Sequence, residues 1–104
     1  MPRLAFKMKL QPGAAAEYKK RHDEIWPELA AELRAAGVSD YSIFLDEETL
    51  TLFAVQTLSE NNTAAALPDS TVMRRWWNFM APLMETEPDR SPWAKPLPEV
   101  FHLD

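Results

Sequence analysis

Two neighbouring segments of this 104-residue chain have the pattern of β-strands that are apolar on both faces. Val38–Asp46 and Leu50–Leu58 are rich in β-branched and aromatic residues, and the acidic turn Asp46–Thr49 between them is short enough for a hairpin. A sheet made of such strands must be covered on both faces. Because so short a chain cannot cover both, we expect a second copy to cover one of them.

The N-terminal third predicts one strand followed by helix. Residues 3–10 alternate apolar and basic side chains, which is typical of a strand. Ala14–Ala36 is rich in helix formers and ends before Gly37, a common C-terminal stop. Pro27 lies inside this segment and removes one helical hydrogen bond, so we expect either a kink or two abutting helices.

The C-terminal third predicts a second helix, an arm and a last strand. Ser70 is a helix-start residue, and large apolar side chains recur after it at helical spacing as far as Met84. Five of the nine prolines lie in Pro82–Pro98, which favours an extended arm. The β-prone run Val100–Leu103 follows, and we expect the last strand there.

The order of these elements is β-α-β-β-α-β, which predicts an α+β fold of the ferredoxin-like sandwich type in one domain, residues 1–104. Such a sheet carries both helices on one face. The other face is apolar here and is expected to pack against the same face of a second copy. The fold class is therefore a dimeric ferredoxin-like sandwich, and the predicted partner is an identical chain.

Composition excludes several classes of function. Sixteen acidic and eleven basic residues leave a net charge of −5, which disfavours nucleic acid and anionic membranes as partners. The absence of cysteine excludes disulfides, thiolate metal sites and cysteine nucleophiles. With two glycines in the chain there is no glycine-rich phosphate loop, so dinucleotide-fold and P-loop cofactors are excluded. The chain has no apolar stretch long enough for a membrane helix or signal peptide, which predicts the cytoplasm.

His22 is the first candidate for chemistry. It follows Tyr18 by four residues, so the two side chains share a helix face, and it falls on the apolar stripe that faces the sheet. A histidine on such a stripe is more often a hydrogen-bonded core residue than a catalyst. Histidine can nevertheless give or take a proton near neutral pH. His102, eighty positions away, is the only other histidine, so we expect no metal site.

Three aromatic residues are further candidates. Trp76 and Trp77 flank the stripe of methionines in the second helix, where core packing is the simpler interpretation. An indole beside polar groups can also bind the C–H face of a sugar ring. Because adjacent helix positions diverge by about 100°, we expect one indole to pack in the core and the other to be available for such a ring. Tyr41 shares a strand face with two apolar residues, and sequence does not distinguish a core tyrosine from a pocket hydroxyl there.

Five segments spread over nearly the whole chain carry recognisable motifs, and the first, which includes Arg-His-x-x-Ile-Trp-Pro-Glu-Leu, is the most specific: Tyr18–Leu29, Tyr41–Asp46, Arg75–Trp77 with Met80 and Met84, Pro88–Pro92 and Glu99–Leu103. Together they resemble the L-rhamnose mutarotase family. The resemblance implies an isomerase that interconverts the α and β anomers of L-rhamnose, without a cofactor, as a cytoplasmic homodimer. It also implies that His22 is the acid/base residue and that Tyr18, Tyr41, Trp76 and Trp77 bind the sugar.

The sequence is also compatible with two other functions. The same fold carries cofactor-independent monooxygenases that act on aromatic substrates, and a dimeric pocket with tryptophan and histidine suits one of those. The chain could also be a non-enzymatic dimeric binding module in which His22 is only structural. Oxygen consumption without anomer exchange is the sign of the first, and the absence of both is the sign of the second.

Overall fold

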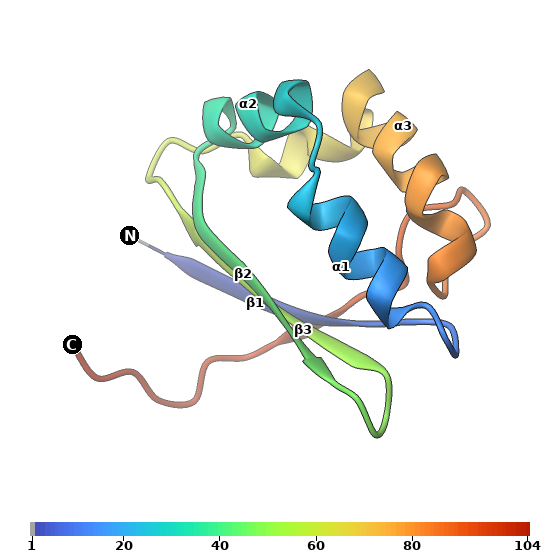
Figure 1. Ribbon diagram of the computed structural model, residues 1–104. Coiled ribbons are helices and arrows are strands. Elements are labelled where there is room, and N and C mark those ends of the chain that lie inside the picture. Colours follow the sequence, from blue (N-terminus) through green and yellow to red (C-terminus); the bar gives the residue numbers. More distant parts are fainter. Residues whose placement is uncertain (1) are drawn as a thin grey trace.

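The computed structural model describes residues 2–104 and contains one four-stranded antiparallel sheet in the order β2-β3-β1-β4. The strands are β1 (Arg3–Lys9), β2 (Val38–Asp46), β3 (Thr51–Leu58) and β4 (Lys95–Leu97). The α-helices are α1 (Ala15–Asp23), α2 (Pro27–Ala35) and α3 (Thr71–Met80), with short 3₁₀ turns η1 (Ala64–Asp69) and η2 (Ala81–Leu83). All three α-helices lie on one side of the sheet (Figure 1).

The long N-terminal helical segment is divided at its proline. Trp26 is extended, with φ −60° and ψ 128°, and Pro27 then takes the first position of α2, where its missing N–H has no helical partner to lose. The expectation of two abutting helices is therefore confirmed, and the kink within one continuous helix is not what forms. The break lets α1 and α2 meet the sheet at different angles (Figure 1).

Helix α3 begins where the sequence predicts and ends sooner. The Ser70 hydroxyl oxygen accepts a hydrogen bond from the Met73 N–H at 3.2 Å and so caps the helix. The helix ends at Met80, because Pro82 falls in the next turn and cannot continue the hydrogen-bond ladder. Met84 therefore lies outside the helix, contrary to the prediction. It forms an isolated antiparallel bridge with Leu10, and both residues are buried.

The prediction of the last strand at Val100–Leu103 is wrong. The edge strand β4 is Lys95–Leu97, which pairs with β1 in the register Ala5↔Leu97. Continuing that antiparallel register brings residue 99 level with Arg3, the first residue of β1. Residues 100–103 thus run past the end of β1, where there is no strand for them to pair with. They form no strand, and their apolar side chains are exposed.

The two faces of the sheet differ in how they are covered. The inner face packs against the helices, and its Met8, Leu52 and Ala54 belong to the core with Leu29 and Met80. The outer face carries the cross-strand pair Phe44↔Phe53, and 63% of the Phe44 surface is exposed. Apolar residues of β2 and β3 lie on both faces, as expected, although β1 adds basic residues such as Lys7 beside Phe53 on the outer face. No helix lies over the outer face (Figure 1).

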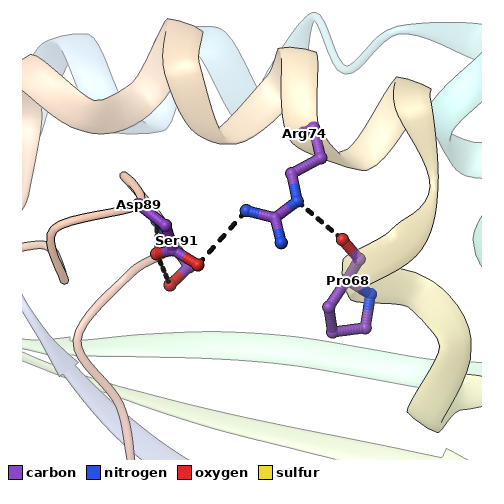
Figure 2. Close-up of polar contacts among 4 residues, drawn as sticks. All are labelled: Pro68, Arg74, Asp89 and Ser91. Carbon is purple, nitrogen blue, oxygen red and sulfur yellow. Dashed lines mark hydrogen bonds and ion pairs between the residues drawn. The ribbon is translucent and has the colours of Figure 1, made fainter.

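The Pro-rich arm is held to α3 by a hydrogen-bonded network, shown in Figure 2, and is less extended than predicted. Arg74 donates from Nε to the Pro68 carbonyl at 2.7 Å and from Nη1 to Asp89 Oδ2 at 3.2 Å. The other Asp89 oxygen accepts from the Ser91 N–H and hydroxyl at 3.0 and 2.5 Å. These contacts, those from Ser91 above all, lower the pKa of Asp89 to about 2.

Candidate active site

His22 and Tyr18 lie on the inner face of α1, as their spacing predicts. Their ring centroids are 4.3 Å apart with an angle of 30° between the planes. Tyr18 is buried in the core cluster, whereas His22 is half-buried. The imidazole is therefore supported on one side by the phenol ring and is still within reach of solvent.

The backbone determines which nitrogen of His22 carries a proton. Nδ1 lies 3.1 Å from the carbonyl oxygen of Tyr18, one helical turn earlier. A carbonyl oxygen can only accept, so Nδ1 is the donor and Nε2 of the neutral ring has a free lone pair. Burial lowers the pKa of His22, and the Tyr18 carbonyl and the charge of Asp23 offset part of that effect. The ring is thus a neutral base at neutral pH.

Trp76 contacts His22 from helix α3. Its indole meets the His22 ring edge-on, with centroids 5.4 Å apart and an angle of 87°. Trp76 is only 6% exposed and also packs edge-on against Trp26 at 5.1 Å. It joins α3 to α1 and α2 and at the same time limits how the imidazole can turn.

The surroundings of Trp77 differ from those of Trp76. Trp77 is half-buried against the core, and the Arg74 guanidinium lies 5.5 Å from its ring centroid. Among the described residues, no ring contact joins it to His22. The two indoles therefore differ in environment, as expected from adjacent helix positions.

Tyr41 approaches the site from β2, the edge strand. Its charge is among the influences that raise the pKa of Tyr18, although burial of Tyr18 is the larger cause. Burial also raises the pKa of Tyr41 itself, although 37% of the residue surface remains exposed. Both phenols therefore stay protonated at neutral pH.

Gln56, on β3, is associated with Tyr41 and was not among the residues predicted from the sequence. It is 7% exposed and continues the inner-face series of Leu52 and Ala54 on β3. Hydrogen bonding from its side chain lowers the pKa of Tyr41 and so opposes the effect of burial. The available signal was a polar residue at a position where strand alternation calls for an apolar one.

His102 lies apart from this group. Its ring contacts Arg3, and its Nε2 donates to Asp104 Oδ1 at 2.8 Å, in the tail that follows β4. Within residues 2–104, no three histidine, aspartate or glutamate side chains are arranged to hold a metal ion. None of the helices described combines the length and the apolarity needed to cross a membrane.

The arrangement suits proton transfer on a small polar molecule with apolar faces. It offers one neutral imidazole with a free Nε2, two protonated phenols and indole surfaces beside them. Such a set is suited to acid–base chemistry on a molecule that has both hydroxyl groups and C–H faces, as a sugar does.

Comparisons with known proteins agree with chemistry of this kind. A family model described as L-rhamnose mutarotase matches residues 3–103. Proteins named L-rhamnose mutarotase from Jannaschia sp. and Acidiphilium cryptum are 59% and 57% identical over 103 residues, which is 99% of each chain. A crystal structure of an L-rhamnose mutarotase from Formosa agariphila superposes with a TM-score of 0.93 at 50% identity, covering 100% of both chains. The chain belongs to the L-rhamnose mutarotase family.

Proposed function

We propose that this protein interconverts the α and β anomers of L-rhamnose by acid–base catalysis, with His22 as the proton carrier and Tyr18, Tyr41, Trp76 and Trp77 as the sugar-binding residues. One observation carries the proposal. The Tyr18 carbonyl holds the Nδ1 proton of His22, so a single basic nitrogen, Nε2, is left available beside the aromatic side chains. Membership of the family supports anomer exchange over oxygenation and over mere binding.

The reaction needs only a proton relay. Nε2 of His22 takes the proton of the anomeric hydroxyl, the C1–O5 bond breaks, and O1 becomes the aldehyde oxygen while O5 takes up a proton from a hydroxyl or water. Rotation about C1–C2 and closure on the opposite face then reverse these transfers, so no proton is gained or lost overall. A base of this kind contributes about 10²–10⁴-fold in rate, which suits a reaction that already proceeds slowly in water.

The phenols and indoles have binding roles in this scheme. Because burial raises the pKa of both Tyr18 and Tyr41, their hydroxyls stay protonated and can donate hydrogen bonds to sugar oxygens. The half-buried indole of Trp77 offers apolar surface for the C–H face and methyl group of the sugar, whereas Trp76, which is 6% exposed, packs against His22. No cofactor takes part in the proposed reaction.

The proposal extends to the assembly. We infer one mutarotase-like domain over residues 1–104, a ferredoxin-like sandwich of the dimeric α/β-barrel type, working in the cytoplasm as a homodimer. The strand order β2-β3-β1-β4, with every helix on one face, supports the sandwich. The exposed Phe44 and Phe53 on the other face support a partner sheet there, and the net charge of −5 disfavours nucleic acid and membrane surfaces as partners.

Saturation-transfer NMR on L-rhamnose at anomeric equilibrium tests the activity directly. With the protein present, irradiation of one anomeric proton should reduce the signal of the other at a rate proportional to protein concentration. Exchange no faster than in buffer would contradict the proposal. Oxygen uptake with an aromatic substrate in the same preparation would point to the monooxygenase alternative instead.

A further inference from the structure

Tyr41 and Gln56 face each other across the β2–β3 ladder at a place where the ladder is irregular. The pairs Ile43↔Ala54 and Ser42↔Val55 set an antiparallel register, and one further step places Tyr41 opposite Gln56. After that step the register shifts, because Ser39 pairs with Thr57. Two residues of β2, Asp40 and Tyr41, therefore oppose the single Gln56, which is a β-bulge.

The backbone of the bulge is in an uncommon conformation. Asp40 has a φ of +46°, in the left-handed region that aspartate and asparagine tolerate better than most residues. This extra residue absorbs the register shift and leaves Tyr41 on the inner face with Ile43 and Leu45. Bulges often redirect a side chain beside an active site. Here the bulge lies directly beside one of the proposed sugar ligands.

Gln56 is an unusual residue for its position. Its neighbours on the same face of β3, Leu52 and Ala54, are 1% and 0% exposed and pack in the core. A side-chain amide at such a site costs free energy unless a polar group pairs with it. Directly opposed residues of an antiparallel pair have Cβ atoms about 5 Å apart, within reach of a glutamine amide and a phenol. Of the two residues opposite Gln56, Asp40 is exposed, and Tyr41 is the one whose hydroxyl the Gln56 side chain hydrogen-bonds.

We propose that Gln56 is a positioning residue, whose amide holds the Tyr41 hydroxyl in the orientation that binds the sugar. The inference rests on the proposed function of the site. Gln56 acts through Tyr41 and has no proton-transfer role, so its loss should weaken sugar binding and leave the chemical step at His22 largely intact. The direction of its effect on the Tyr41 hydroxyl, opposite to that of burial, agrees with a hydrogen bond between the two groups.

A double-mutant cycle tests this. Gln56→Leu keeps the volume and removes the amide, and we expect KM for L-rhamnose to rise about three- to tenfold with kcat within twofold. In the Tyr41→Phe background the same change should have no further effect on KM, because the hydroxyl it positions is gone. Thr51→Val, at the other end of β3, is the control and should leave both constants unchanged.

A spectroscopic readout separates positioning from direct contact with the sugar. The chain has two tyrosines, Tyr18 and Tyr41, so protein labelled with ¹³C at tyrosine Cζ gives two signals that Tyr18→Phe assigns. Gln56→Leu should move the Tyr41 signal and leave that of Tyr18 nearly in place. A raised KM with an unmoved Tyr41 signal, or equal effects of Gln56→Leu with and without the Tyr41 hydroxyl, would overturn the inference.

These experiments distinguish a failure of the proposed function from a failure of the proposed role of Gln56. If the wild-type protein does not accelerate anomer exchange, the proposed function fails, and the Tyr41 signal still reports whether Gln56 positions the phenol. If the wild type is active and Gln56→Leu matches it in KM and in the Tyr41 signal, only the role of Gln56 is rejected. Gln56→Asn, with a shorter amide, gives a second variant should the leucine protein fail to fold, and it should also raise KM.

Discussion

The carbonyl oxygen of Tyr18 lies 3.1 Å from Nδ1 of His22 and thereby determines the tautomer of the imidazole. The contact is internal to helix α1, since the two residues are one turn apart. It leaves Nε2 as the basic atom, and burial keeps that atom unprotonated by lowering the pKa of the ring. The proton chemistry of the site thus depends on one side chain and one turn of helix.

Activity should depend on pH in one direction. The pKa of His22 is lowered in the folded protein, so the neutral base should persist below pH 6.5, and exchange should fall only under more acidic conditions. The raised pKa of each tyrosine predicts no loss from phenol ionisation below about pH 10. Exchange rates between pH 4.5 and 9 test this, and an acidic midpoint above 6.5 would contradict it.

The stability of the fold should also depend on the protonation of His22. Because the unfolded chain binds a proton at His22 at higher pH than the folded one, the contribution of this group is present above about pH 6.5 and is lost as pH falls toward the folded value. Thermal unfolding of the wild type and His22→Gln at a series of pH values isolates this contribution. The difference between them should change with pH only in that acidic range.

Trp76 and Trp77 should respond differently to replacement. Trp76→Phe removes buried contacts with His22 and Trp26, so it should lower stability by about 1–3 kcal/mol and reduce kcat by loosening the imidazole. Trp77→Phe affects a half-buried ring beside Arg74 and should mainly raise KM. Thermal unfolding and exchange kinetics on both variants test this difference. Equal effects of the two substitutions on stability and on KM would contradict the assignment of separate roles to Trp76 and Trp77.

The sequence predicted correctly those features that depend on residues close together in the chain. The Pro27 break, the Ser70 cap and the shared face of Tyr18 and His22 all follow from helix geometry within a few residues. The last strand was misplaced because its pairing depends on where β1 begins, a fact about register between distant segments. The association of Gln56 with Tyr41 could not be predicted for the same reason, since the bulge opposite Gln56 is defined only by the pairing of β2 with β3.

Asp89 should titrate unusually low. Its pKa is lowered to about 2, chiefly by the hydrogen bonds from Ser91, so the arm contact shown in Figure 2 should be present above the ordinary aspartate value and be lost as pH falls through about 2. The amide chemical shift of Ser91 should report this midpoint, and Asp89→Asn should abolish the titration. A midpoint near 4 would show that the network does not hold the carboxylate.

The outer face of the sheet should mediate dimerisation. Light scattering should give about 24 kDa, twice the 11.9 kDa of one chain. Phe44→Glu puts a charge on the exposed centre of this face and should produce folded monomers. Ala31→Glu, which adds the same charge to the exposed side of α2, should leave the dimer intact. A wild-type mass of 12 kDa at micromolar concentration would contradict the proposed assembly.

The most direct test of the account is anomer exchange by His22→Ala, measured by NMR on L-rhamnose together with thermal unfolding of the same preparation. The account predicts a dimer that melts near the wild-type temperature and has lost most of the exchange, by about 10²-fold or more. His102→Ala, which removes the other histidine, should keep wild-type exchange. A well-folded His22→Ala protein that exchanges the anomers at the wild-type rate would contradict the proton-carrier role of His22.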